Sequence, residues 1–124
     1  FNFTGRYWPG YVDLTRRTFL RGLPVELRAQ AQTDRAGARL QAILEDASGQ
    51  RFCYDLGPVP ASVWTVVRGS LQGPTRYWGG AGDGIARFPL HFLSLRLAQG
   101  PEGAPASGEI RLRDVFVRTL APTP

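Results

Sequence analysis

The amino-acid sequence predicts an all-β domain, built as an antiparallel β-sandwich or jelly roll. Three observations support this prediction. Apolar and polar residues alternate with a period of two, turns rich in Gly, Pro, Asp and Ser interrupt that alternation, and helical periodicity is nearly absent. About seven or eight short strands of this kind are typical of a sandwich. The 124 residues are enough for one domain with its own core.

Each expected strand follows from alternation between two turns. In the clearest case Leu27, Ala29 and Ala31 alternate with polar residues, and the Asp-Arg-Ala-Gly turn at 34–37 leads to an antiparallel partner. The prolines at 58 and 60 exclude a central strand at that point, and the glycines at 79, 80, 82 and 84 predict a long loop over 73–84. The expected strands are 11–20, 25–32, 39–45, 52–56, 63–71, 91–97 and 110–116.

The later strands carry predictions about single residues. Trp64 is in phase with Val66, and core packing is the expectation for their shared face. His91 is in phase with three leucines of its strand, which predicts a histidine on an apolar face. Asp114 is in phase with Leu112 and Phe116, where the alternation requires an apolar side chain.

The basic residues are all arginine, 15 in number, and the formal net charge is +5. They are scattered along the chain, whereas basic patches that follow a phosphate backbone are denser and mixed with stacking aromatics. Solvated outer faces of strands explain them better, so we expect no nucleic-acid partner. No apolar run approaches the length of a membrane span, and we expect no membrane partner. A weaker alternative is an anionic polysaccharide, because arginine forks match carboxylates.

The chain is expected to be one domain cut from a longer polypeptide. It begins Phe-Asn-Phe, contains no Met, and ends Leu-Ala-Pro-Thr-Pro. We therefore expect a single β-sandwich over 1–119 and the start of a Pro/Thr linker over 120–124. The lone Cys53 excludes an intramolecular disulfide, and a buried structural thiol is the expectation for it.

Catalysis is not expected. Triad chemistry would need His91, the only histidine, which the alternation places on an apolar face. Glycosidase chemistry needs two facing carboxylates, and most of the ten acids lie in turns without an obvious pair. The Gly-Gly-Ala-Gly-Asp-Gly run at 79–84 lacks the helix and lysine of a phosphate-binding loop.

Asp114 leaves three interpretations open. A buried carboxylate is costly unless it is paired or bound to a metal. It could be a ligand of a structural Ca²⁺, together with Asp13 and backbone carbonyls. It could instead form a salt bridge or accept hydrogen bonds from loop amides. A change of phase at Arg113 is the third interpretation, and it would turn Val115 and Val117 inward. No other cofactor is expected.

Aromatic residues supply the candidate ligand site. Trp78 and Tyr77 lie in the glycine-rich loop, where an exposed ring could stack on the C–H face of a sugar, with Arg76 and Asp83 as hydrogen-bonding neighbours. Trp8 and Tyr11 form a second cluster with the tyrosine at position 7. The alternative is that these aromatics form a lid over the core. Another candidate is a sheet face, on which Arg39, Gln41, Tyr54, Arg111 and Arg113 would form one groove.

The middle of the chain resembles galactose-binding-like β-sandwiches. The resemblance rests on ARLQAILEDASGQRFCYDLGPVPASVWTVVRGSL, on YWGGAGDG followed by FPLHFLSLRL, and on SGEIRLRDVFV, and it spans about residues 11–119. That group includes carbohydrate-binding modules of glycoside hydrolases and accessory domains without a known ligand. The resemblance implies a non-catalytic module that binds a poly- or oligosaccharide for a neighbouring domain, secreted or at the cell surface. The alternative is a structural accessory domain that packs on its neighbour.

Overall fold

The computed structural model describes residues 3–7, 11–33, 38–59, 63–99 and 108–120, with side chains described for 16–33, 39–59, 63–97 and 111–120. These residues form nine strands in two antiparallel sheets, and no helix occurs among them. The all-β prediction is therefore confirmed. Within the same ranges no helix has the length or the apolar character to cross a lipid bilayer.

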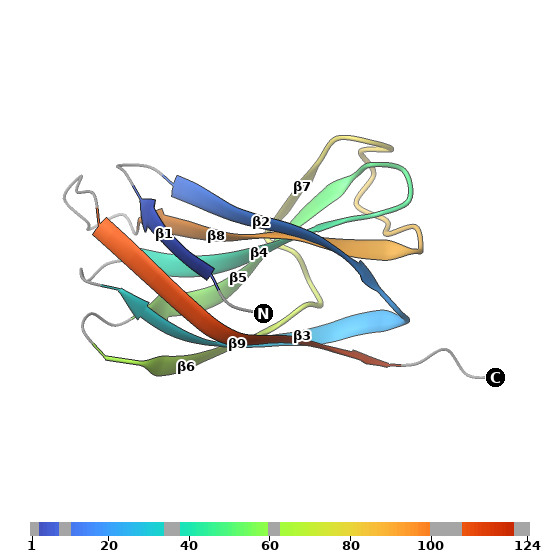
Figure 1. Cartoon of the computed structure of the whole chain (residues 1–124). Coiled ribbons are helices and arrows are strands. Elements are labelled where there is room, and N and C mark those ends of the chain that lie inside the picture. Colours follow the sequence, from blue (N-terminus) through green and yellow to red (C-terminus); the bar gives the residue numbers. More distant parts are fainter. Residues whose placement is uncertain (1–2, 8–10, 34–37, 60–62, 100–107, 121–124) are drawn as a thin grey trace.

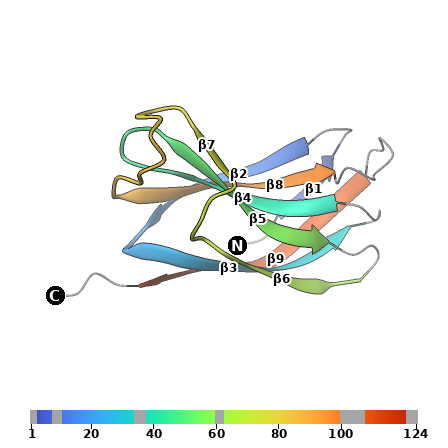
Figure 2. The same ribbon diagram turned by 180° about the vertical axis from the view of Figure 1, so that it is seen from behind.

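The two sheets lie one above the other as layers (Figure 1). Sheet A has four strands in the order β1 (Phe3–Tyr7), β9 (Gly108–Leu120), β3 (Leu23–Thr33) and β6 (Thr65–Ser70). Sheet B has five strands in the order β2 (Tyr11–Leu20), β8 (Leu90–Gln99), β4 (Ala38–Glu45), β5 (Arg51–Val59) and β7 (Arg76–Trp78). The view from behind shows β6 beneath β5, each near one edge of its sheet (Figure 2).

The core fills the space between the two sheets, as the alternation predicts. Leu27, Ala29 and Ala31 of β3 are fully buried and face the inner residues of sheet B. The inner residues of sheet B include Leu40, Ala42 and Leu44 of β4, Phe52, Tyr54 and Leu56 of β5, and Phe92, Leu95 and Leu97 of β8. Removing this apolar surface from water is the main force that holds the layers together.

A β-bulge in β9 explains the position of Asp114. Arg113 pairs with Gln30 and Phe116 pairs with Arg28, so Asp114 and Val115 together lie opposite one residue of β3. Asp114 has a φ of 53°, a left-handed conformation that aspartate tolerates better than most residues. The extra residue changes the phase of the strand: Val115 is buried, and Asp114 and Phe116 are exposed. The phase change at Arg113 is confirmed, and the inward position of Asp114 is wrong.

A similar bulge in β8 corrects the prediction for His91. Ser94 pairs with Ile43 and Phe92 pairs with Leu44, which leaves Leu93 as the extra residue. Phe92 therefore faces the core, and His91 lies on the opposite face of the sheet. There its ring contacts Phe19 edge to face, with 5.4 Å between the ring centroids. The expectation of His91 in phase with Leu95 and Leu97 is wrong, because alternation counts residues and does not detect an inserted one.

In β6 the alternation was predicted correctly, but the face that points into the core was not. Trp64 and Val66 share a face, but Trp64 is 37% exposed and Val66 is 53% exposed, whereas Val67 is buried. The inner face of β6 carries small residues because the sheets approach closely there. A Cβ atom on Gly69 would lie 2.9 Å from the backbone Cα of Leu56 and 2.5 Å from its Cδ2, so any other residue would require the backbone to shift.

Several strand boundaries differ from the prediction. β5 continues through Pro58 to Val59, which is possible because β7 pairs only with 51–53 and leaves an edge at the proline. The expected loop over 73–84 contains the short strand β7, and β1 was not expected. β9 ends at Leu120. The linker residues after it lie outside the described ranges, and the linker stays a prediction.

Candidate functional site

The outer face of sheet B is covered by its own side chains. Arg76 of β7 and Arg96 of β8 both approach the Trp78 ring, at 5.4 and 5.8 Å from its centroid. β7 and β8 are separated by β4 and β5, a span of about 14 Å at the usual strand spacing. The indole and the Arg96 side chain must therefore meet above β4 and β5. Ile43 and Cys53 on the outer face of those strands are buried to 2% and 0% exposure.

Ion pairs occupy the rest of this face. Glu45 accepts a hydrogen bond of 2.7 Å from Arg17 and one of 3.4 Å from Arg51. The bond from Arg17 is the main reason that the pKa of Glu45 lies below its usual value. Arg39 binds both carboxylate oxygens of Asp55, and that bond raises the pKa of the guanidinium. These contacts pair the carboxylates of Glu45 and Asp55 with arginines of the same protein.

Asp46 organises the turn between β4 and β5. One carboxylate oxygen accepts hydrogen bonds from the backbone N–H groups of Ser48 and Gln50 and from the Ser48 hydroxyl. The other accepts the backbone N–H of Arg87 at 3.1 Å, which ties the turn to the segment that leads into β8. Burial alone would raise the pKa of Asp46, but these hydrogen bonds outweigh it and lower the pKa below its usual value.

The buried Gln50 side chain extends the same connection to the 83–87 segment. Its oxygen accepts the N–H of Gly84 at 2.8 Å, and its amide nitrogen donates to the carbonyl of Ile85 at 3.2 Å. Figure 1 shows the β4–β5 turn beside the segment that follows β7. Gly80 packs so closely on the turn that a Cβ atom would lie 2.3 Å from the Gln50 nitrogen. We call Asp46, Ser48, Gln50 and the 79–87 segment the loop clamp.

The residues predicted to bind sugar in the glycine-rich loop are divided between two places. Trp78 and Arg76 stack on each other over the outer face of sheet B. Tyr77 points the other way, with its ring 6.5 Å from that of Phe52, and it remains 48% exposed. Asp83 is held by Arg87 through two bonds of 3.0 and 2.7 Å, and this contact lowers its pKa strongly.

The second aromatic cluster and the metal pair lie partly outside the described residues. Trp8 is among the residues not described, and Tyr11 lies in β2 opposite Ala98 with its side chain not described. Asp13 also lies in β2, in sheet B, whereas Asp114 lies in β9, in sheet A. Among the described side chains no group of three His, Cys, Asp or Glu could hold a metal ion. Because Asp114 is exposed, the burial argument for Ca²⁺ no longer applies.

The expected groove of five outward residues is not formed. Arg39 and Gln41 lie on sheet B, whereas Arg111 and Arg113 lie on sheet A. Tyr54 is 6% exposed and faces the core, where burial raises its pKa. The prediction that Tyr54 points outward is therefore wrong.

The outer face of sheet A is different, because it carries exposed apolar side chains beside exposed cationic ones. Cross-strand pairing arranges them in rows that run from β9 through β3 to β6. Arg113 lies 4.0 Å above the Trp64 ring and donates to the Gln30 side chain at 2.6 Å. The successive rows are Arg113–Gln30–Val66, Phe116–Arg28–Arg68, Arg118–Glu26–Ser70 and Leu120–Leu23.

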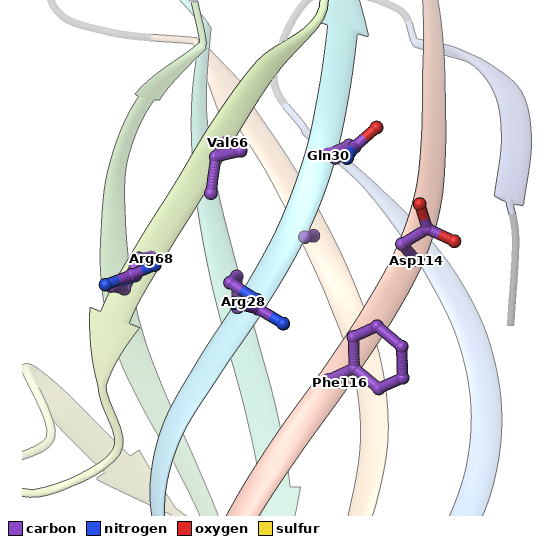
Figure 3. Close-up of a pocket in the computed structure, with 7 residues that line it drawn as sticks. Arg28, Gln30, Val66, Arg68, Asp114 and Phe116 are labelled. Atoms are coloured by element: carbon purple, nitrogen blue, oxygen red, sulfur yellow. The ribbon is translucent and has the colours of Figure 1, made fainter.

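A shallow groove of about 440 Å³ lies across the middle of these rows. Arg28 and Gln30 of β3 line its centre, Val66 and Arg68 of β6 line one side, and Asp114 and Phe116 of β9 line the other (Figure 3). The Phe116 ring is 56% exposed, with the Arg28 guanidinium 5.7 Å from its centroid. An aromatic surface surrounded by donors and one carboxylate can bind a flat ligand that carries hydroxyl groups.

Sequence reasoning missed Arg28, Arg68 and Phe116 as site residues. Alternation places Arg28 and Arg68 on outer faces, but only the strand order shows that β3 and β6 are neighbours. Phe116 was expected in the core, and the bulge at Asp114 turns it outward. The available signal was the three-residue spacing between the apolar residues Leu112 and Val115, which indicates an inserted residue.

Comparison with known proteins assigns neither a family nor a function to this chain. A scan against protein-family models found no match, and a search of curated proteins found none either. The function must therefore be argued from the surfaces of the chain itself.

Proposed function

We propose that this chain is a non-catalytic carbohydrate-binding β-sandwich that holds a neighbouring domain at a polysaccharide. Its fold would be a jelly roll of the galactose-binding-like type, as the sequence resemblance implies. Tethering a weak sugar-binding surface to an enzyme raises the local concentration of the enzyme at its substrate without any new catalytic group.

The groove on sheet A is the observation that supports this proposal. Sugar rings present flat arrays of C–H groups that pack on an aromatic face, and their hydroxyl groups need donors and acceptors around the ring. Phe116 offers an exposed face, while Gln30 at the centre of the groove and Asp114 at its side carry hydrogen-bonding groups. The outer face of sheet B supports it less well, because Trp78 already lies over its own sheet.

A structural accessory domain is the second candidate, and one observation favours it. Leu120 and Leu23 pair on the outer face of sheet A and are 52% and 41% exposed. Apolar residues exposed together at one end of a sheet are typical of a surface that another protein covers. In that case the chain would bind its neighbouring domain and no free sugar.

Polysaccharide pull-down and a glycan array on the 124-residue chain test the proposal. We expect wild type and Trp78→Ala to bind the same glycan, and Phe116→Ala to lose most of the binding. Loss in Trp78→Ala with retention in Phe116→Ala would move the site to the glycine-rich loop. Repeating the assay with EDTA tests the Ca²⁺ hypothesis. Absence of binding to every glycan, with stable co-elution of the chain and its separated neighbouring domain, would favour the accessory domain.

A further inference from the structure

Two arginines are direct cross-strand neighbours in the groove of sheet A. Arg28 of β3 and Arg68 of β6 are register partners, and both side chains are exposed. Directly opposed residues have Cβ atoms about 5 Å apart, and like charges at such positions destabilise a sheet. Within the part of the chain whose side chains are described, neither guanidinium forms a salt bridge. Arg28 contacts the Phe116 ring, but that contact does not offset the repulsion between the two guanidinium groups.

The third member of the row is Phe116. Figure 3 shows Arg68, Arg28 and Phe116 in line across β6, β3 and β9. The row therefore offers an exposed aromatic face followed at once by two guanidinium groups. A ligand that matches it has a flat apolar surface with an anionic group attached at a short, fixed distance.

From this row we infer that the groove binds a polysaccharide containing uronic acid, with one carboxylate held between Arg28 and Arg68. This inference rests on the proposed function and specifies its substrate class. In a uronic acid the carboxyl carbon is bonded directly to the sugar ring, so a ring on Phe116 brings its carboxylate to the arginines. Planar guanidinium groups match a carboxylate with paired hydrogen bonds, and the anion removes the repulsion between the two cations.

Nucleic acid fits the same surface less well. Asp114 lines the groove, and Glu26 occupies the next row between Arg118 and Ser70. Two carboxylates close to the binding track repel a phosphate backbone and a polyuronate alike, so the difference must lie in the hydrogen bonds that each ligand can offer them. They can accept hydrogen bonds from sugar hydroxyl groups, which a polysaccharide supplies along its whole length.

The test measures affinity for four soluble polymers: polygalacturonate, neutral galactan, dextran sulfate and oligothymidylate. We expect polygalacturonate to bind most tightly, and Arg28→Gln and Arg68→Gln each to weaken it by roughly tenfold, the scale of a lost charged hydrogen bond. Arg21→Gln is the matched control, since it removes the same charge from an exposed position outside the groove. The affinity should also fall moderately as salt rises.

The melting temperature of the free chain gives an independent readout. Removing either member of a like-charge pair should leave Tm unchanged or raise it slightly, so weaker binding in Arg28→Gln would not come from unfolding. The inference is overturned if galactan binds as tightly as polygalacturonate and the arginine variants have no effect; the proposed function would then still stand. Tighter binding of dextran sulfate or oligothymidylate also overturns it. Absence of binding to any glycan would remove both proposals.

Discussion

The outer faces of sheets A and B use arginine in different ways. On sheet B, Arg17 and Arg51 contact Glu45, and Arg76 and Arg96 stack on Trp78. On sheet A, Arg28 stands opposite Arg68 without an acidic partner among the described side chains. Arginine is thus paired with carboxylates on sheet B, whereas on sheet A Arg28 and Arg113 contact aromatic rings and Arg28 also lies beside a second cation. Charge counts along the sequence cannot distinguish these roles, because the difference lies in the register of neighbouring strands.

The aromatic residues show the same contrast. Trp78 lies over the outer face of sheet B, where Ile43 and Cys53 are buried. Phe116 projects from sheet A and leaves more than half of its surface in solvent. An exposed ring contributes little to folding and is available for a ligand, so we expect substitutions on sheet B to change stability and those on sheet A to change binding.

The loop clamp should show the largest effect on stability. Asp46→Ala removes the acceptor for the buried N–H of Gln50 and for the N–H of Arg87, and unsatisfied buried donors are costly. We expect the free energy of unfolding in urea to fall by about 3 kcal/mol. Ser70→Ala on the outer face of sheet A is the control and should change it by less than about 0.5 kcal/mol. Equal effects at the two positions would contradict the division between the faces.

Trp78→Ala should have the next largest effect. It removes a stacking partner from two arginines, and we expect it to open the outer face of β4 and β5, where Ile43 and Cys53 are buried. Because the indole is only half-buried, we expect a loss of about 2 kcal/mol, below the range for a fully buried tryptophan. The Cys53 thiol should then react faster with a thiol reagent in the folded protein. Unchanged stability and thiol reactivity would show that Trp78 does not cover this face.

Acid should lower the free energy of unfolding, by less than either substitution. The pKa values of Glu45, Asp46 and Asp83 are lowered by folding, so their contribution is present above their unfolded pKa values. Stability should therefore fall as the pH drops below about 5, towards the lower pKa values of the folded chain. Asp46→Asn should reduce the slope of unfolding free energy against pH. A slope identical to that of wild type would mean that Asp46 does not titrate differently in the two states.

Sequence alone predicted the parts of the fold that depend on local alternation. The inner faces of β3, β4 and β5 follow from residues such as Leu27, Leu40 and Phe52, because every second side chain must be apolar there. Predictions failed where a residue is inserted or where both faces carry apolar groups. The faces of His91 and Phe116 were predicted wrongly because each residue lies next to a β-bulge that reverses the alternation. The face of Val66 was predicted wrongly because it lies in an edge strand whose two faces are similar in hydrophobicity.

The candidate site depended on information that alternation does not contain. A loop tryptophan such as Trp78 can bind a ligand or cover its own sheet, and only the position of Arg96 distinguishes the two. The Arg28–Arg68 pair requires β3 and β6 to be adjacent although β4 and β5 separate them in sequence. Long-range strand order therefore determines the surface chemistry of this chain.

The bulge at Asp114 also limits how β9 can join its sheet. In a regular strand, a slide of two residues keeps the same side chains inside, so several pairings compete during folding. β9 is 13 residues long, and its inner residues change parity between Leu112 and Val115. A slide of β9 by two residues would carry the bulge along, so that Asp114 and Val115 would lie opposite Leu27 or Ala31 in place of Ala29. One left-handed aspartate thus makes the native register of the longest strand in the described chain different from its two-residue slides, which a regular strand would leave equivalent.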